Sequence, residues 1–317
     1  MNTCLSAPFK TLRVSLTDQC DLRCLYCVDP KATPQVVEHL TPAQLAAAVG
    51  LLLRNLPLTK LKLTGGEPLL GHRLEQFLDA LGPQPNLEIS LTTNAQQLKQ
   101  KLEVIQRHQI KRINISLDSL DEGCFSKLTG GALHKTLEGL EAALEAGFQV
   151  KLNMVPMRGI NDQECLDLFE FAAKRGVQLR YIELMDMGHL CGSEFGRRLF
   201  DRGEILAQIR EKHTVTESAR PNHDTAQVFE VVGVGNFGII ANHSKPFCDD
   251  CNRLRLSSAG DLVGCLSSAF ARPIKDLLDL APDDADQAVK PLLHAAFGDK
   301  QTAGFTGSKL VMKAIGG

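Results

Sequence analysis

The alternation of short apolar runs with longer amphipathic stretches over residues 12–183 constrains the fold more than any other feature. The short runs are typical of strands, and the longer stretches place apolar residues at helical spacing. Strand starts recur about every 33 residues, the length of a β-α-β unit. The predicted strands are residues 12–16, 60–63, 87–91, 112–117, 149–154 and 178–183, and the predicted helices are residues 42–54, 96–108, 134–146 and 162–174. Such repeats build a parallel sheet, either doubly wound or curled into a barrel.

Short polar turns follow nearly every predicted strand, and they favour the barrel. They comprise residues 17–20, 64–68, 92–94, 118–119 and 184–186. In a parallel barrel these turns converge at the carboxyl ends of the strands, where active sites are assembled. We therefore predict an α/β fold, an incomplete (β/α)6 barrel of the TIM type, open on one side because it has six strands instead of eight.

The alternation of short apolar runs with longer amphipathic stretches ends beyond a predicted helix at residues 204–212. Strand-like runs at residues 228–232 and 237–240 precede a cysteine-rich stretch, and from residue 273 the chain is expected to form short helices and loops. We predict a partial barrel over residues 1–215 and a C-terminal domain over residues 216–317.

The composition narrows the classes of function. A net charge of −2 over 317 residues, without Trp and with two Tyr, predicts no binding of nucleic acid. No apolar run reaches the roughly 18–20 residues of a membrane span, and the first ten residues lack the pattern of a secretory signal. We expect a cytoplasmic protein with no membrane partner, in which ten cysteines indicate metal rather than disulfides.

Two sets of three cysteines stand out by their spacing. Cys20, Cys24 and Cys27 follow the first predicted strand with C-x3-C-x2-C spacing. Three thiolates on one loop can bind three irons of a cubane and leave the fourth iron open. Cys248, Cys251 and Cys265 form the second set, again with no evident fourth ligand. Taken alone, the Cys-x-x-Cys pair of the second set is equally compatible with a structural zinc site.

The first set and two further motifs carry a resemblance to a known superfamily. Tyr26 before the third cysteine, and Gly65-Gly66-Glu67-Pro68 after the second strand, resemble the signature of radical S-adenosylmethionine enzymes. Nearly the whole chain further resembles the GTP 3′,8-cyclase family of molybdenum cofactor biosynthesis. The matching segments are residues 12–18, 91–94, 114–118, Lys151, residues 180–186, residues 247–257 and the Gly316-Gly317 tail.

The resemblance implies a reaction and its cofactors. It implies two [4Fe-4S] clusters, the first binding S-adenosylmethionine and the second binding the guanine of GTP. A one-electron reductant splits S-adenosylmethionine, and the resulting 5′-deoxyadenosyl radical abstracts the ribose 3′ hydrogen before the sugar closes onto C8. The implied product is (8S)-3′,8-cyclo-7,8-dihydroguanosine 5′-triphosphate, which cyclic pyranopterin monophosphate synthase would consume. The resemblance also implies a homodimer.

The resemblance assigns roles to particular residues. Those expected to contact S-adenosylmethionine are Tyr26, Gly65, Gly66, Glu67, Ser116 and Met185. Those expected to contact GTP are Arg13, Lys62, Thr92, Lys151, Arg180, Arg253, Leu254 and Arg255. The basic residues suit a substrate with several negative charges, since arginine binds phosphate oxygens bidentately and lysine acts as a point charge. Arg13 and the Gly316-Gly317 tail are expected to support catalysis.

The chain also departs from the family pattern. Lys62 stands where arginine is more common, Ala95 where glycine is usual, and Val28-Asp29 where Met-Pro is common. The main alternative is a divergent radical enzyme with one auxiliary cluster that acts on another substrate, such as a peptide. An electron carrier would need four thiolates per cluster, and a zinc-stabilised binding module would be indifferent to S-adenosylmethionine.

Overall fold

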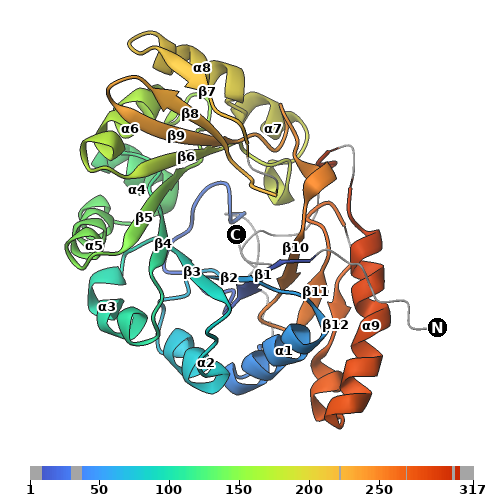
Figure 1. Cartoon of the computed structure of the whole chain (residues 1–317). Coiled ribbons are helices and arrows are strands. Elements are labelled where there is room, and N and C mark those ends of the chain that lie inside the picture. The colour runs from blue at the N-terminus through green and yellow to red at the C-terminus, as the bar shows by residue number, and fades with distance from the viewer. Residues whose placement is uncertain (1–8, 30–37, 221–222, 269, 302–303, 308–317) are drawn as a thin grey trace.

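A single twelve-stranded sheet organises the computed structural model (Figure 1). The structure describes residues 9–29, 38–220, 223–268, 270–301 and 304–307. The strands are β1 (Thr11–Ser15), β2 (Lys60–Thr64), β3 (Glu88–Thr93), β4 (Arg112–Ser116), β5 (Gln149–Met154), β6 (Gln178–Ile182), β7 (Val215–Glu217), β8 (Gln227–Val231), β9 (Gly235–Ile240), β10 (Arg253–Leu256), β11 (Asp261–Val263) and β12 (Arg272–Pro273). Their order in the sheet is β12-β11-β10-β1-β2-β3-β4-β5-β6-β9-β8-β7.

Helices cover the outer face of this curved sheet (Figure 1). They are α1 (Pro42–Asn55), α2 (Arg73–Leu81), α3 (Leu98–Arg107), α4 (Glu122–Thr129), α5 (Leu133–Glu145), α6 (Cys165–Lys174), α7 (Ser193–Arg198), α8 (Arg202–Arg210) and α9 (Pro282–Gly298). The α/β prediction is confirmed, and each of the six predicted strands lies within two residues of β1 to β6. The helices α2, α4 and α7 and the strands β7, β11 and β12 were not predicted.

The parallel part of the sheet is longer than predicted. Strands β1 to β6 pair in parallel in chain order, and two later strands join them at opposite edges. β10 pairs in parallel with β1, and β9 pairs in parallel with β6. Strands from both sides of residue 215 thus share one sheet, and the division into two domains at that residue stays a prediction.

Alternation along the strands separates a core from a lumen. In β1, Leu12 and Val14 are fully buried toward the helices, whereas Arg13 between them points to the concave side. β2 repeats the pattern, because Leu61 and Leu63 are buried and Lys62 faces the concave side. Each central strand therefore gives one row of side chains to the apolar core and the other row to the inner surface.

The prediction of short helices and loops after residue 273 is wrong for α9, which runs unbroken from Pro282 to Gly298. Pro291 lies inside this helix, where a proline removes a backbone hydrogen bond. Pro282 at the first turn favours the start of the helix. The apolar face, with Val289 and Leu293 fully buried, packs against α1 and β11 and compensates for the interior proline.

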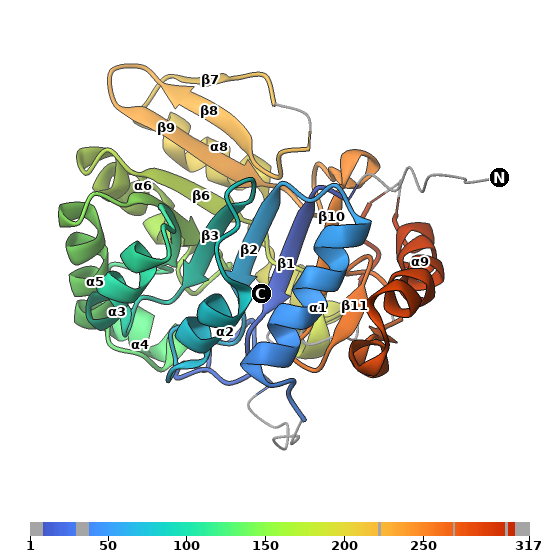
Figure 2. The same cartoon turned by 60° about the horizontal axis from the view of Figure 1, so that its bottom comes forward.

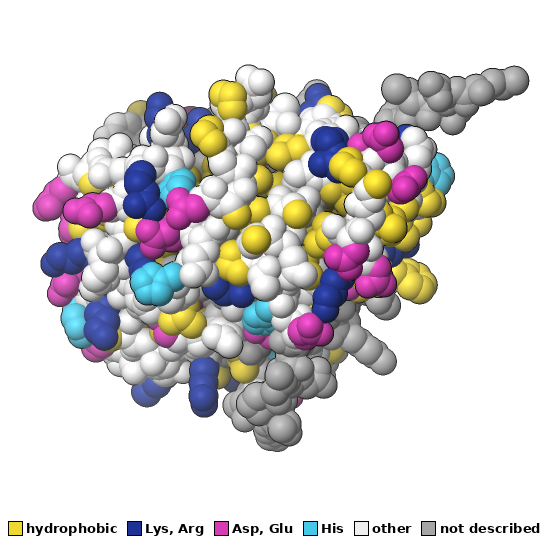
Figure 3. Space-filling model, turned by 90° about the horizontal axis from the view of Figure 1, so that it is seen from below, with side chains coloured by type: hydrophobic (Ala, Val, Ile, Leu, Met, Phe, Trp, Pro, Cys, Tyr) yellow, Lys and Arg dark blue, Asp and Glu magenta, His cyan; other side chains and the backbone are white. Residues whose placement is uncertain are grey.

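The outside of the molecule shows no concentration of one charge on the face seen from below (Figure 3), where acidic, basic and apolar side chains are interspersed. Figure 2 shows α9 beside α1 at one end of the sheet, and the hairpin of β8 and β9 with β7 at the other. Within the described part of the chain, no helix combines the length and apolarity needed to span a bilayer.

Candidate active site

A cavity of about 1540 Å³ lies on the concave side of the sheet. It brings together segments far apart in the sequence, because all the parallel strands point their carboxyl ends to the same side. The predicted site residues that line it are Arg13, Cys20, Cys24, Tyr26, Cys27, Lys62, Gly65, Gly66, Glu67, Thr92, Ser116, Arg180, Met185, Cys248, Cys251, Arg253, Arg255 and Cys265. Both cysteine sets and most of the predicted cations therefore face one space.

The first cysteine loop, residues 16–27, rests on the glycine pair that follows β2. Gly66 donates from its backbone N–H to the carbonyl of Thr17 at 2.6 Å, and Glu67 donates to the carbonyl of Gln19 at 2.8 Å. A Cβ on Gly65 would lie 2.7 Å from the Thr17 carbonyl oxygen, and one on Gly66 would overlap the Gln19 carbonyl. Only glycine fits at these positions, because two backbones touch there.

Glu67 ties this contact to the next strand. Its buried carboxylate accepts from the Thr93 hydroxyl at 2.7 Å, from the Asn94 backbone N–H at 2.8 Å and from the Leu69 N–H at 2.9 Å. Burial raises the pKa of Glu67 to about 7, although these hydrogen bonds act in the opposite direction. The side chain holds the turns after β2 and β3 together beside Cys20, toward which the Asn94 side-chain amide points at 3.9 Å.

Tyr26 is fixed by a carboxylate at the end of β4. Its hydroxyl donates to Asp118 at 2.7 Å, and the other Asp118 oxygen accepts from the Val155 N–H at 2.8 Å. Burial raises the pKa of Asp118 to about 6. Tyr26 thereby connects the cysteine loop to the ends of β4 and β5, and it lines the cavity.

The second cysteine loop leads from β9 to β10. Cys248 and Cys251 flank a single turn of 3-10 helix, and Cys265 follows β11. The segment before Cys248 is held by Glu183, a fully buried carboxylate after β6. Glu183 accepts from the backbone N–H groups of His243 at 2.9 Å and Ser244 at 3.0 Å, and from the Ser244 hydroxyl.

The six thiols of the two sets are free and lie on the cavity wall. Burial raises the pKa of Cys20 to about 11 and of Cys24 well above its ordinary value, so both need a compensating positive charge to ionise. Within the described residues, no group of three His, Cys, Asp or Glu side chains lies close enough together to bind one metal ion. A cubane places its cysteines on different irons and needs a wider set of thiols than a single zinc ion.

Three cations stand side by side across neighbouring strands. Arg13 in β1 is directly opposite Lys62 in β2 and Arg255 in β10. Like charges opposite each other in a sheet are unfavourable unless an anion lies between them. Burial, together with Arg13, Arg180 and Arg253, lowers the pKa of Lys62 to about 7, and burial lowers that of Arg13 to about 10. This row has the chemistry of a polyanion site.

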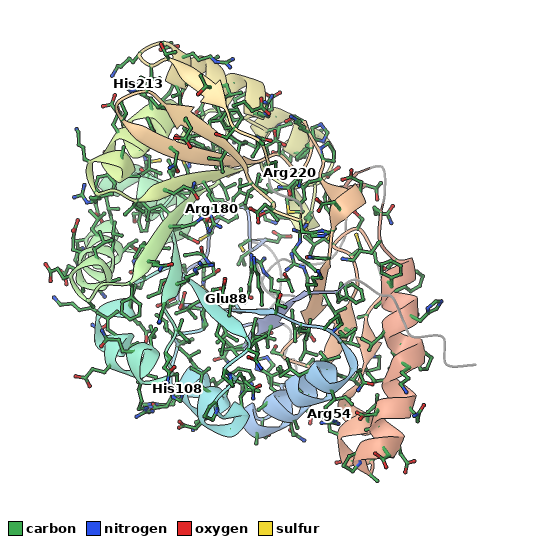
Figure 4. All side chains as sticks on the ribbon, in the orientation of Figure 1. Arg54, Glu88, His108, Arg180, His213 and Arg220 are labelled. Atoms are coloured by element: carbon green, nitrogen blue, oxygen red, sulfur yellow. The ribbon has the colours of Figure 1, made fainter. Side chains whose placement is uncertain are left out.

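Arg180 reaches toward the same space from β6 (Figure 4). Its guanidinium donates to Asn153 at 3.0 Å and to Asn114 at 2.6 Å, both amides facing the lumen from β5 and β4. Burial lowers its pKa to about 10. Amides orient the guanidinium without neutralising it, so its charge remains available to a bound anion.

Two predicted residues, Lys151 and Leu254, do not line the cavity, and two others lie outside the described residues. Lys151 is exposed and donates to Gln178 at 2.7 Å, and the Leu254 side chain is buried in the core on the opposite face of β10. Gly316 and Gly317 lie outside the described residues. The roles predicted for all four stay predictions.

Several cavity residues were missed by the sequence analysis. Asn114 and Asn153 could have been predicted from the sequence. They lie two residues from Ser116 and Lys151 on the same strands, and side chains two residues apart point to the same face of a sheet. Lys300, which follows α9, also lines the cavity. The sequence did not indicate this, because Lys300 lies in no motif.

Solved structures share the fold at low sequence identity. The crystal structure of Streptococcus suis SuiB bound to S-adenosylmethionine superposes with a TM-score of 0.61 at 15% identity, covering 85% of this chain and 64% of that one. SuiB bound to the precursor peptide SuiA gives 0.62 at 16% identity, covering 93% of this chain and 66% of that one. This likeness supports the α/β architecture of the sheet and its covering helices.

The sequence comparisons are more specific. Residues 14–172 match the Radical SAM superfamily, and residues 177–305 match the family described as Molybdenum Cofactor Synthesis C. A GTP 3′,8-cyclase of Aquifex aeolicus is 37% identical over 281 residues, 87% of each chain. One of Campylobacter lari is 39% identical over 269 residues, 83% of this chain and 82% of that protein. With such identity over most of both chains, this protein belongs to the GTP 3′,8-cyclase family of the radical S-adenosylmethionine superfamily.

Proposed function

We propose that this enzyme converts GTP to (8S)-3′,8-cyclo-7,8-dihydroguanosine 5′-triphosphate, the first step of molybdenum cofactor biosynthesis. The observation that carries the proposal is one cavity lined by two three-cysteine sets and by the row of Arg13, Lys62 and Arg255. Relatives named GTP 3′,8-cyclase support the same reaction. The proposal includes a one-electron reductant, cyclic pyranopterin monophosphate synthase as the next enzyme, and a homodimer.

The donor sets fit two iron–sulfur clusters. Cys20, Cys24 and Cys27 would hold one cluster, and its open iron would bind S-adenosylmethionine near Tyr26, Ser116 and Met185. The Leu22 N–H already points to the Cys20 sulfur at 3.4 Å, as N–H groups do around cluster thiolates. Cys248, Cys251 and Cys265 would hold the second cluster beside the guanine. When bound, the first cluster and S-adenosylmethionine supply the radical that starts the reaction.

The chain itself contributes orientation and charge. Arg13, Lys62, Arg180, Arg253 and Arg255 would bind the triphosphate, and their mutual repulsion in its absence is relieved by the ligand's negative charge. Thr92 accepts from Asn114 at 3.3 Å, which orients its hydroxyl on the cavity wall toward the nucleotide. The wall encloses the reacting groups and limits the access of water.

The alternative, a radical enzyme acting on a peptide, is compatible with the fold, since SuiB was crystallised with a precursor peptide. The in-register cations favour GTP, because three basic side chains opposite one another suit a ligand with several negative charges better than a neutral peptide.

The test is anaerobic reconstitution with iron and sulfide, followed by quantification of 5′-deoxyadenosine with GTP, with ATP and without nucleotide. We expect GTP-dependent release at about eight irons per chain, four for each cubane. Cys265→Ser should halve the iron content and abolish the product while S-adenosylmethionine still binds. Release of 5′-deoxyadenosine that does not depend on GTP would contradict the proposal and would favour the peptide alternative.

A further inference from the structure

Lys300 makes a direct contact with a cysteine of the second set. The residue lies two positions beyond the end of α9, and its ammonium group donates to the Cys251 sulfur at 3.2 Å. The same group donates to the backbone carbonyl of Arg253, the first residue of β10. The lysine thus bridges α9 to the exit of the second cysteine loop.

Contacts of Lys300 and of its neighbours in the chain fix the position of its side chain. The preceding residue, Asp299, is paired with Arg272 of β12 through both carboxylate oxygens. The Lys300 ammonium also lies 5.3 Å from the centroid of the Phe9 ring. Phe9 packs edge-on against Phe297 in the last turn of α9. These contacts preorganise the ammonium beside the sulfur and lower the entropy cost of holding it there.

No carboxylate in the described part of the chain pairs with Lys300, which is half-buried on the cavity wall. The contrast with Lys275 and Lys245 is direct, since both are exposed and paired with glutamates. In the described part of the chain, the side-chain atom that accepts a hydrogen bond from Lys300 is the Cys251 sulfur. A charge-assisted bond is strongest to an ionised acceptor, such as a cluster thiolate.

We propose that Lys300 is a positioning residue that raises the reduction potential of the second cluster through its hydrogen bond to Cys251. This inference rests on the proposed function, which places a cluster on Cys248, Cys251 and Cys265. One-electron reduction adds negative charge to the cluster, and a fixed cation at a ligand sulfur stabilises the reduced form more than the oxidised form. The electron comes from the external reductant, and Lys300 keeps its protons throughout.

The experiment isolates the second cluster in the full-length chain. Cys20, Cys24 and Cys27 are all replaced by serine, and the reconstituted protein is titrated with dithionite under electron paramagnetic resonance. Lys300→Met, Lys300→Gln and Lys300→Arg are compared in this background. Lys290→Met is the matched control, because Lys290 lies on α9 and bonds to Gln287 rather than to sulfur.

We expect Lys300→Met to lower the equilibrium constant for reduction about tenfold, equivalent to about 59 mV for a one-electron couple. Lys300→Gln should lower it less, since it keeps a donor without the charge. Lys300→Arg and Lys290→Met should stay near the parent value. If Lys300→Met fails to hold iron, the Gln and Arg variants make the same comparison.

The outcomes separate the inference from the proposed function. A cluster of about four irons whose potential is the same in all four variants overturns the inference alone. A parent protein that binds no iron through the second set overturns the second cluster of the proposed function, and the role of Lys300 with it. A shift confined to the Met and Gln variants supports both.

Discussion

The two cysteine loops are held in place by different means. The first, residues 16–27, is pressed against the Gly65-Gly66 pair, backbone to backbone, with no space for a side chain. The second, residues 241–251, is held by side chains, because Glu183 binds Ser244 and Asp250 accepts from the His223 N–H at 2.6 Å. The first loop therefore has one permitted geometry, whereas substitutions can adjust the second.

This difference suits the two proposed tasks. A cluster that cleaves S-adenosylmethionine needs the same cofactor geometry whatever the substrate, and a backbone contact provides it. A cluster beside the substrate can be adapted through the polar side chains around it. The comparison predicts that each loop can be disrupted independently of the other.

Gly66→Ala should give the largest effect and disrupt the first loop alone. The added methyl group would overlap the Gln19 carbonyl, and the loop must move at a cost on the order of 4 kcal/mol in unfolding free energy. We expect about half of the iron to be lost and 5′-deoxyadenosine release to stop. Gly50→Ala in α1, where the methyl meets no atom within 4 Å, is the control. Full iron content in the Gly66 variant would refute the packing argument.

Glu183→Gln should disrupt the second loop alone. The amide offers an N–H where the carboxylate now accepts from backbone N–H groups, which should cost about 2–3 kcal/mol in unfolding free energy. We expect iron loss from the second set with S-adenosylmethionine binding retained, measured by iron analysis and equilibrium dialysis. Glu138→Gln, an exposed residue paired with Lys99 away from both loops, is the control and should change neither. Equal loss of both functions would contradict the independence of the loops.

Lys62→Met should stabilise the free protein by about 1–2 kcal/mol while weakening GTP binding, because the lysine is buried among cations. Its folded-state pKa of about 7 lies below the ordinary value, so the unfolded chain binds more protons between these two values. The parent's stability should therefore rise with pH above 7, and the advantage of the methionine variant should shrink. Denaturant titrations at pH 6 and pH 9 check this, and an advantage that is equal at both would be evidence against it.

Ala95→Gly should give the smallest effect and sharpen the account of the first loop. Ala95 follows Asn94, which binds Glu67, and has φ of 63°, the left-handed region where a Cβ costs about 1 kcal/mol. Glycine removes that strain and adds entropy to the unfolded chain, so we expect a gain of under about 1 kcal/mol. Thermal unfolding measures it, with the exposed Gln109→Gly, φ 58°, for comparison. A loss of stability would show that the packing contacts of the Ala95 Cβ contribute more to stability than its left-handed backbone conformation costs.

The sequence predicted most of what depends on local pattern. Strand periodicity located β1 to β6, and cysteine spacing with the Gly65-Gly66 motif located residues that the structure brings to one cavity. Arg253 and Arg255, both expected to contact GTP, lie on one face of β10 and line the cavity.

What the sequence could not predict depends on contacts between distant segments. Nothing near Lys300 indicates that it reaches Cys251, because the two meet only after α9 packs against α1 and β11. The length of α9 also depends on tertiary packing, which outweighs the interior Pro291 as a local helix breaker. Glu183 lies in a recognised motif. Its role as the acceptor for the His243 backbone N–H depends on a contact between distant segments that the motif does not indicate.

The pairing of β1 with β10 also has a consequence for biosynthesis of the chain. Thr11 is made early and finds its partner Arg253 only after most of the chain has been translated. Until then one edge of the first strand offers unpaired backbone groups to other nascent chains. Contacts so distant in sequence slow folding and prolong the exposure of partly folded forms. Yield should therefore depend strongly on chaperones, and insertion of the proposed second cluster must wait until Cys265, which follows β11, has been synthesised.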